Sequence, residues 1–441
     1  EIRADPARPV PLLRRLQGDV GSGNPAVAAR ALAAVARQGR QGALLAPTDL
    51  LARQHAKTVA GLVADLGVAV ELVTGSLPAD RRRAAGDAVR SGMAGIVVGT
   101  HALLQESLAF HDLALAVVDE QHRFGVEQRG ALEAKSRHGS PHVLLMTATP
   151  IPRTIGQVVY ADLDLSTLHT PPEGRLTVKT AIRHPDELDR LWLFVDGEAE
   201  AGRATFVVVP AIDETEDSDI VAAEAEAERL RTRFPNRRVG LVHGRMKAQD
   251  RDLELARLRD GELDILVGTT VLEVGVDVPR ASVMVVQSAE LFGLAQLHQL
   301  RGRVGRGSEQ SYAALVSAAA SSHAWAEMTA GRRVPETTEQ ARLLAVAGTS
   351  DGFELAERDF ELRREGDVLG LAQSGLPRLR VATLADPRHR ELAVRARYAA
   401  SDLLDDTGEL GPELDALADE LRRGWLARVF AGDPADAATP A

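Results

Sequence analysis

The stretch that best defines the fold is LALAVVDE (residues 113–120), an apolar run that ends in two carboxylates. A continuous apolar run of this length is typical of a strand buried on both faces of a parallel sheet. Four similar runs surround it: GALLAP (42–47), VAVELVTG (68–75), GIVVGT (95–100) and HVLLMTAT (142–149). Enough residues for a helix separate each run from the next, so the pattern predicts βαβ units around a parallel sheet.

A second series of strand-like runs follows the Pro/Gly-rich break at 169–177, which we interpret as a linker. Its members are LTVKTAIR (176–183), TFVVVPAI (205–212), RVGLVHG (238–244), LDILVGTT (263–270), SVMVVQSA (282–289) and YAALVS (312–317). The sequence therefore predicts an α/β protein with two doubly wound parallel-sheet lobes, at 1–170 and 171–320. Residues 321–441 read as a mostly helical region with a disordered tail.

Composition narrows the class of protein. The chain has 441 residues, no cysteine and a formal net charge of −11. Disulfides and thiol metal sites are therefore excluded, and a protein that binds nucleic acid through one broad basic surface would usually be less acidic. The sequence contains no apolar run long enough for a membrane span and opens without a signal peptide. These features favour a cytoplasmic globular protein with no membrane partner.

The two carboxylates that end the 113–120 run are candidate catalytic groups. At the carboxyl edge of a parallel sheet, where ligands of α/β proteins bind, Asp119 can hold Mg²⁺ and Glu120 can orient a water molecule. The alternative is an acidic strand end that begins a helix. Thr147 and Thr149 follow one strand later, in a hydroxyl-rich turn suited to hydrogen bonding across a cleft.

The segment QLHQLRGRVGRG (296–307) carries three arginines separated by glycines, which allow the backbone to turn and gather the guanidinium groups. Planar guanidinium forks match phosphate oxygens in a bidentate fashion, so Arg301, Arg303 and Arg306 predict a phosphate-facing segment rather than a plain basic loop. Upstream of it, GTTVLEVGVDVP (268–279) adds a hydroxyl pair and the acidic Asp277 at a strand end.

A glycine-rich stretch near the start, GDVGSGNP (18–25), has most of a phosphate-binding loop. Its G-x-x-x-x-G spacing is right and an Ala-rich helical run follows, but Lys and Ser or Thr are replaced by Asn24 and Pro25. Asn24 cannot supply the cation, and Pro25 has neither a hydroxyl nor a backbone N–H. Proline is tolerated in a first helical turn, so we expect the fold to survive and the chemistry to be impaired.

Taken in order, these segments resemble the motifs of superfamily 2 helicases and translocases, and more closely those of the RecG family of branch-migration helicases. The matching segments, in motif order I, Ia, Ib, II, III, IV, V and VI, are GDVGSG (18–23), LAPTDLLARQH (45–55), VGTHALLQ (98–105), DEQHRFGVEQR (119–129), TATPIPRT (147–154), LVHGRM (241–246), TTVLEVGVDVP (269–279) and QLHQLRGRVGRG. Residues 351–375 resemble the TRG region, which couples ATP turnover to translocation in that family.

The resemblance implies two RecA-like lobes that clamp ATP and Mg²⁺, with roles for named residues. Asp119, as the metal ligand, would act with Glu120, Gln299, Arg303 and Arg306 in catalysis. Nucleotide contacts would come from Gly18, Asp19, Gly21, Ser22, Gly23, Asn24, Pro25 and Asp277. DNA contacts would come from Thr100, His101, His243, Thr269 and Thr270. Coupling residues would be Thr147, Thr149, Arg358, Arg363 and Gln373.

The implied activity is ATP-dependent remodelling of stalled forks and recombination intermediates, by a monomer on branched or forked DNA at the bacterial nucleoid. Single-stranded-DNA-binding protein is a further candidate partner. Because motif I reads GSGNP, we expect little ATP turnover. The family's wedge domain has no counterpart here, so we expect a fragment that lacks fork selectivity. Two alternatives stay open: a non-hydrolysing DNA- or protein-binding module, and a fragment of the transcription-repair coupling factor Mfd.

Overall fold

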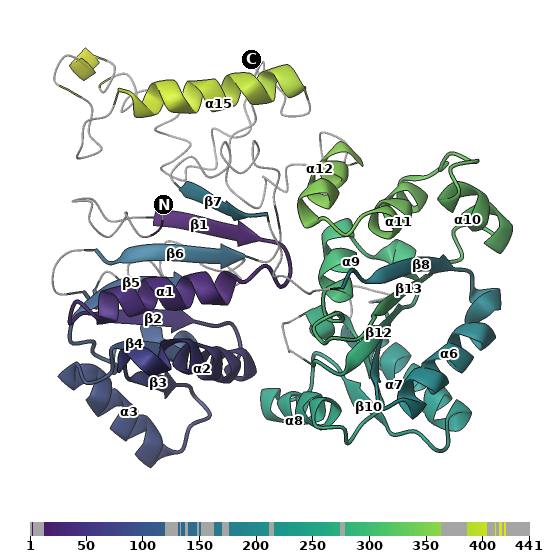
Figure 1. The fold of residues 1–441 in the computed structure, drawn as a ribbon, viewed down its shortest axis with the longest axis horizontal. Coiled ribbons are helices and arrows are strands. Elements are labelled where there is room, and N and C mark those ends of the chain that lie inside the picture. The colour runs from purple at the N-terminus through teal and green to yellow at the C-terminus, as the bar shows by residue number, and fades with distance from the viewer. Residues whose placement is uncertain are drawn as a thin grey trace.

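The computed structural model contains two α/β lobes that lie side by side (Figure 1). It describes residues 13–119, 140–147, 163–169, 176–210, 216–273, 278–362 and 386–403, with short pieces at 2, 131–132, 134–136, 150, 411, 414–416 and 419. The predicted fold class, two doubly wound parallel-sheet lobes, is confirmed. In the described part of the chain, no helix combines the length and apolar character that crossing a membrane requires.

The first lobe is built on a seven-stranded sheet with the order β3-β4-β2-β5-β6-β1-β7, in which the pairings are parallel. Its strands are β1 (Leu13–Gly18), β2 (Gln41–Leu45), β3 (Val70–Val73), β4 (Ile96–Gly99), β5 (Leu113–Val118), β6 (His142–Thr147) and β7 (Asp164–Leu168). Its helices are α1 (Asn24–Ala36), α2 (Asp49–Val63) and α3 (Ala79–Ser91).

Alternate residues of each strand enter opposite cores, because side chains in a strand point to the two faces in turn. Leu44 of β2 packs with Leu32 of α1 in one core. Its neighbour Leu45 packs with Val89 of α3 in the other core. Helices therefore cover both faces, which explains why the strands read as continuous apolar runs.

The second lobe repeats this plan on a six-stranded parallel sheet with the order β10-β11-β9-β12-β13-β8. Its strands are β8 (Lys179–Arg183), β9 (Ala204–Val208), β10 (Val239–Val242), β11 (Ile265–Gly268), β12 (Ala281–Val286) and β13 (Tyr312–Val316). One face carries α6 (Leu188–Glu200) and α7 (Glu216–Arg233). The other carries α8 (Ala248–Arg259), α9 (Leu294–Arg301), α10 (Ser322–Thr329), α11 (Thr338–Gly348) and α12 (Gly352–Leu362).

The structure adds two strands, β1 and β7, that the apolar runs do not predict. β1 reads LRRLQG, and its Arg14 is 6% exposed. The Arg14 guanidinium donates to Ser166 Oγ at 3.0 Å and pairs with Asp164 Oδ2 at 3.2 Å, both on β7. A buried guanidinium is tolerated when it is paired and hydrogen-bonded, so these strands do not need apolar sequences.

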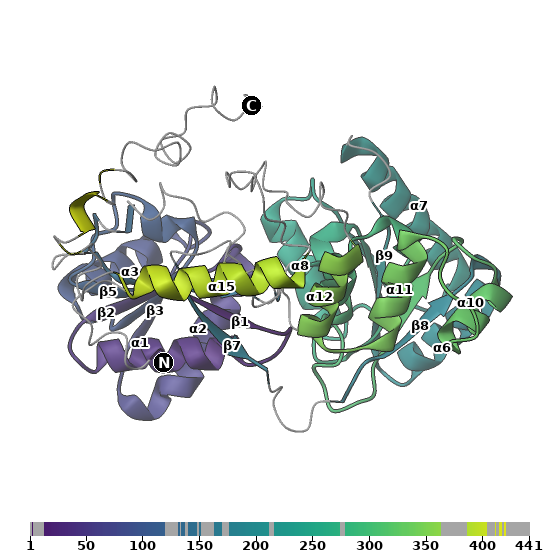
Figure 2. The same ribbon diagram turned by 90° about the horizontal axis from the view of Figure 1, so that it is seen from above.

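The region after residue 320 connects to both lobes. Trp325 of α10, Leu343 of α11 and Leu355 of α12 belong to the core of the second lobe. Helix α15 (Pro387–Ser401) lies above the first lobe in Figure 1, with one end directed toward α12 of the second lobe (Figures 1 and 2). Its Arg390 pairs with Glu357 of α12 at 3.4 Å, and its Arg397 donates to the carbonyl of Leu163 in the first lobe at 2.7 Å. Helix α15 therefore spans the two lobes.

Trp192 is the side chain whose loss should most weaken the second lobe. It is fully buried, and the Arg229 guanidinium lies 5.4 Å from its ring centre. We expect Trp192→Ala to lower the free energy of unfolding by about 3–5 kcal/mol, through the cavity left behind. Among the described residues the indole Nε1 has no hydrogen-bond partner. Trp192→Phe should therefore cost much less, and denaturant titration of both variants tests this; equal losses would contradict it.

Candidate nucleotide site between the lobes

The glycine-rich loop predicted to bind phosphate joins β1 to α1. Gly18 ends the strand, and the helix begins at Asn24 with Pro25 in its first turn. Gly21 has φ 77° and Gly23 has φ 96°, left-handed values that favour glycine. The loop therefore keeps the backbone shape of a strand-loop-helix phosphate site although its last two motif residues differ.

The interior of this loop is filled by its own side chains. A Cβ placed on Gly18 would lie 2.1 Å from Ser22 Oγ and 2.7 Å from Asn24 Oδ1. Asn24 is 9% exposed, and its amide donates to the carbonyl of Thr147 at 3.1 Å, at the end of β6. A neutral amide directed at a carbonyl thus stands where phosphate loops place an ammonium group. As written, the residues of this loop do not fit a triphosphate with its Mg²⁺.

Asp119, the predicted metal ligand, lies at the carboxyl end of β5. Its backbone N–H donates to the carbonyl of Leu45, which ends the neighbouring strand β2. Its carboxylate lies 2.7 Å from Nε2 of His55 on α2, a side chain that is 7% exposed. His55 belongs to the motif Ia segment, and the sequence reading did not assign it a role. His55 is the polar residue on the otherwise apolar buried face of α2, and this position in the sequence pattern could have marked it as a candidate site residue.

The second lobe places α9 and the turn after it against this loop. A Cβ on Gly302 would lie 2.5 Å from Val20 Cγ1, so the Val20 side chain packs against the Gly302 backbone in space that a larger residue at 302 would fill. Arg303 is 5% exposed. Arg306 is half-buried and its Nε donates to the carbonyl of Gly302 at 3.3 Å. Gln299, also half-buried, lies on α9. That these three residues face the nucleotide stays a prediction.

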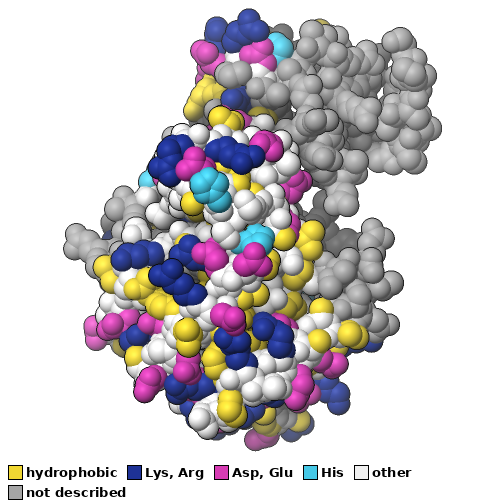
Figure 3. Space-filling model, turned by 90° about the vertical axis from the view of Figure 1, so that its right-hand side faces the viewer, with side chains coloured by type: hydrophobic (Ala, Val, Ile, Leu, Met, Phe, Trp, Pro, Cys, Tyr) yellow, Lys and Arg dark blue, Asp and Glu magenta, His cyan; other side chains and the backbone are white. Residues whose placement is uncertain are grey.

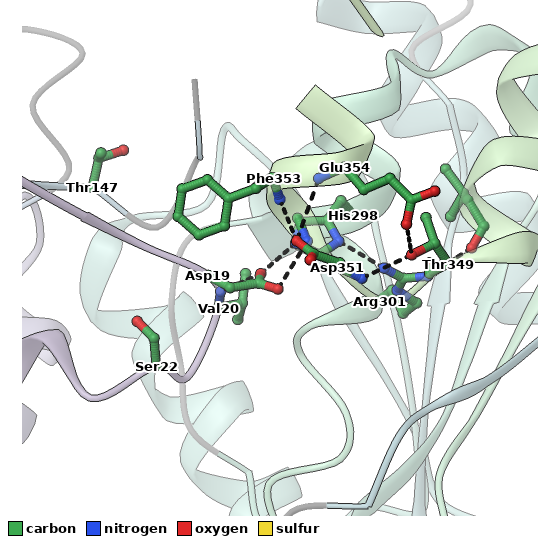
Figure 4. A network of polar contacts seen from close by, with 12 residues as sticks. Asp19, Val20, Ser22, Thr147, His298, Arg301, Thr349, Asp351, Phe353 and Glu354 are labelled. Atoms are coloured by element: carbon green, nitrogen blue, oxygen red, sulfur yellow. Dashed lines mark hydrogen bonds and ion pairs between the residues drawn. The ribbon is translucent and has the colours of Figure 1, made fainter. Parts of the chain in front are cut away.

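Asp19 makes polar contacts that join the two lobes (Figure 4). Its Oδ1 lies 2.5 Å from Nε2 of His298 on α9, and its Oδ2 accepts from the N–H of Gly352 at 3.0 Å. The N–H of Val20 also donates to Oδ1, at 2.6 Å. Burial alone would raise the pKa of Asp19, but these hydrogen bonds hold that pKa below its ordinary value. The sequence reading did not single out His298.

The residues predicted to touch DNA lie at strand ends in both lobes. Thr100 and the exposed His101 follow β4. His243 follows β10, while Thr269 and Thr270 follow β11. Val242 and Gly268 are register partners, so His243 and Thr269 share one edge of the second sheet. Their contact with DNA stays a prediction.

The predicted coupling residues are only partly within the described part of the chain. Arg358 lies on α12 and pairs with Glu354, one turn earlier on the same helix, at 2.6 Å. Thr147 is buried and receives the Asn24 amide. Five predicted site residues lie outside the described residues: Glu120, Thr149, Asp277, Arg363 and Gln373.

The Asp19 contacts predict an acid-dependent loss of stability. Asp19→Asn should lower the free energy of unfolding at neutral pH by about 1–3 kcal/mol, because buried donors lose a charged acceptor. Since the folded pKa lies below the ordinary value of 3.8, this stabilisation is present above that pH and lost as the pH falls through the folded pKa. Denaturant titrations at several pH values should show the difference between the two proteins shrinking on acidification. A difference that widens in acid would contradict this account.

Comparison with known proteins places this geometry in a family. Residues 12–158 match the DEAD/DEAH box helicase family model, and residues 184–308 match the helicase conserved C-terminal domain. The chain is 47% identical over 412 residues to the ATP-dependent DNA helicase RecG of Mycobacterium bovis, covering 88% of this chain and 54% of that protein. It is 42% identical over 427 residues to the Bacillus subtilis RecG, covering 97% of this chain and 60% of that protein.

A solved structure supports the same assignment. The structure of RecG bound to a three-way DNA junction matches with a TM-score of 0.73 and 35% identity, over 90% of this chain and 49% of that one. This chain therefore spans about half the length of the relatives it matches. The lobes, the ordered motifs and these similarities agree: the chain belongs to the RecG family of superfamily 2 helicases.

Proposed function

We propose that the chain is the motor part of a RecG-type DNA helicase or translocase whose ATP turnover is impaired by Asn24 and Pro25. In this proposal it acts as a monomer on branched DNA at the bacterial nucleoid, in the remodelling of stalled forks and recombination intermediates. ATP and Mg²⁺ are the cofactors of the intact motor, and single-stranded-DNA-binding protein is a further partner. The observation that carries the proposal is the direct contact of the motif VI segment with the motif I loop, at Val20–Gly302 and Asp19–His298.

The impairment follows from the contacts within the loop. The Asn24 amide is committed to the Thr147 carbonyl, and Pro25 provides no hydroxyl for a metal ion. The residues on the other wall, including Arg303 and Arg306, keep the types that suit phosphate. What this chain retains is therefore the framework for a clamped nucleotide together with candidate DNA contacts at strand ends.

The outer face of the second lobe is a poor candidate for the DNA contacts. In Figure 3 its Lys and Arg side chains are interspersed with Asp and Glu. Mixed charges of this kind are typical of a solvated surface, whereas nucleic-acid sites gather basic groups on one face. The proposal accordingly places DNA at the strand ends that carry Thr100 and His243.

Two measurements on the unaltered chain test the proposal. Fluorescence anisotropy with a labelled three-way junction should show binding that weakens as salt rises, because phosphate contacts release counterions. ATP hydrolysis should stay at background with and without the junction. Absence of junction binding would contradict the DNA-helicase assignment, and strong junction-stimulated hydrolysis would contradict the impairment.

A second candidate, a non-hydrolysing DNA- or protein-binding module, is favoured by the same Asn24–Thr147 contact. It differs in what happens when the motif is repaired. A module that has lost its motor function elsewhere as well would stay inactive after substitution at residues 24 and 25, whereas an impaired motor would regain turnover.

A further inference from the structure

Three segments that are far apart in the sequence meet at the carboxylate of Asp19. Asp19 follows β1 in the first lobe, His298 lies on α9 of the second lobe, and Gly352 begins α12. The Asp19 and His298 side chains are 28% and 7% exposed, so their contact is shielded from water. A hydrogen bond to a charged group in such a setting contributes more than an exposed one.

The orientation of His298 is fixed from behind by Arg301. The Arg301 guanidinium lies 2.8 Å from Nδ1 of His298 and donates to the carbonyls of Val346 and Thr349 at 2.6 and 2.7 Å. A guanidinium can only donate, so Nδ1 of His298 is the acceptor. The ring hydrogen is then on Nε2, where it is donated to Asp19. Arg301 thus selects the tautomer that bridges the lobes.

Gly352 is packed tightly into this contact. A Cβ there would lie 2.7 Å from His298 Nε2 and 2.8 Å from Asp19 Oδ1. Residue 352 is in the first turn of α12, where alanine would otherwise be the better helix former. Glycine at residue 352 therefore allows α12 to approach the Asp19 carboxylate, although it does not favour helix formation.

A second contact between the lobes is made by α2 of the first lobe. Leu50 of α2 packs against the core of the second lobe. Beside it, burial and the nearby carboxylate of Asp49 raise the pKa of Asp252 on α8, while Arg251 and Arg53 oppose this. The ionised form of Asp252 is therefore less favourable here than in water. At Asp19, by contrast, the carboxylate accepts hydrogen bonds from groups of the second lobe, at His298 and Gly352.

From this geometry we infer that Asp19, His298 and Gly352 form an interlobe latch, in which His298 is a positioning residue that ties the phosphate loop to the start of α12. The role of the latch in translocation rests on the proposed function, but its existence does not. Asp19 directly precedes the turn of the phosphate loop, so a change in that loop displaces its carboxylate. Because the Asp19 carboxylate contacts both His298 and Gly352, its displacement would act on α9 and on α12 together.

The latch can be measured in the chain as it stands, since the absence of cysteine allows specific spin labelling. Cysteines placed at Lys57 on α2 and Arg190 on α6, both exposed, report the distance between lobes by double electron–electron resonance. His298→Ala should lengthen and broaden this distance distribution. The ratio of open to closed arrangements should rise roughly tenfold or more, as expected from losing a hydrogen bond to a charged group. His298→Gln, which keeps a donor, should restore much of the closed population.

Matched controls separate the latch from general loss of structure. His323→Ala removes an exposed histidine from α10 of the same lobe and should leave the distances unchanged. Gly352→Ala should open the lobes, whereas Gly348→Ala, where a Cβ would meet open space, should not. Asp19→Asn should open the lobes less in the His298→Ala background than in the unaltered chain, because the two substitutions share the Asp19–His298 interaction and only the bond from Gly352 remains to be weakened.

Amide hydrogen exchange provides the second readout, which a purely local structural role of His298 would not change. His298→Ala should speed exchange at the N-terminus of α12 and leave α3 of the first lobe unaffected. An unchanged distance distribution in folded His298→Ala or Gly352→Ala would overturn the latch, and so would equal opening in either control. None of these measurements requires ATP turnover, so failure of the proposed function and failure of the latch are distinguishable.

Discussion

Asn24→Lys combined with Pro25→Thr is expected to raise junction-stimulated ATP hydrolysis from background by roughly 10²–10⁴-fold. The change supplies a cation for the phosphates and a hydroxyl for Mg²⁺, and each such interaction contributes roughly 1.5–3 kcal/mol. It also returns a backbone N–H to the first turn of α1, and helix N-termini direct these groups toward anions. The loop can accept the change, because Gly21 and Gly23 already hold its left-handed turns.

The matched control for this double variant is Asn24→Gln with Pro25→Thr, which repairs the hydroxyl and the N–H but keeps a neutral amide at residue 24. It should recover only a small part of the activity. Steady-state hydrolysis with and without a three-way junction, alongside thermal unfolding of each protein, provides the measurement. A folded double variant that stays at background would count against the impaired motor and would favour the non-hydrolysing module.

Arg306→Ala, introduced into the double variant, is expected to return ATP turnover to background. Arginine fingers supply roughly 10³–10⁵-fold in rate, which equals or exceeds the gain expected from repairing the loop. Its Nε is held by the Gly302 carbonyl, and Gly302 itself abuts Val20 of the phosphate loop. Arg306 therefore lies on the side of the second lobe that faces the phosphate loop.

A surface arginine of the same lobe is the control for this loss. Arg333 is exposed and pairs with Glu336 at 2.6 Å, and Arg333→Ala should leave turnover within a few-fold of the double variant. Comparison of kcat and KM for ATP separates a transition-state role, which lowers kcat, from weaker ground-state binding. Similar losses in the two arginine variants, or a loss below about tenfold for Arg306→Ala, would show that Arg306 does not stabilise the transferring phosphoryl group.

The sequence predicts the architecture well where strands are buried on both faces. The runs that contain β5 and β6 are apolar because helices cover both sides of the sheet, so their pattern is unambiguous. The apolar pattern does not predict β1 and β7, because β1 contains a buried arginine. The charge of Arg14 is compensated by hydrogen bonds to Asp164 and Ser166 on β7. A signal for β1 did exist: a glycine-rich phosphate loop is normally preceded by a strand.

The candidate site could be predicted as a set of residue types but not as a set of contacts. Asp19 and His298 are in recognised motifs, yet their contact joins residues 279 positions apart and depends on how the lobes are placed. The same holds for Gly352, which approaches Asp19 from a helix that the motifs assign to another role. A sequence motif indicates which chemical groups a segment contains, whereas the hydrogen-bond partner of each side chain depends on tertiary packing.

The position of β1 in its sheet has a consequence for biosynthesis. This strand pairs with β6 on one side and β7 on the other. Its interstrand hydrogen bonds can therefore form only after residues 142–147 and 164–168 have been synthesised. Contacts of such high sequence separation form slowly. During translation, the glycine-rich turn after β1 therefore acquires its shape only when the nascent lobe is nearly complete, and a stalled ribosome would hold the lobe without its phosphate loop in place.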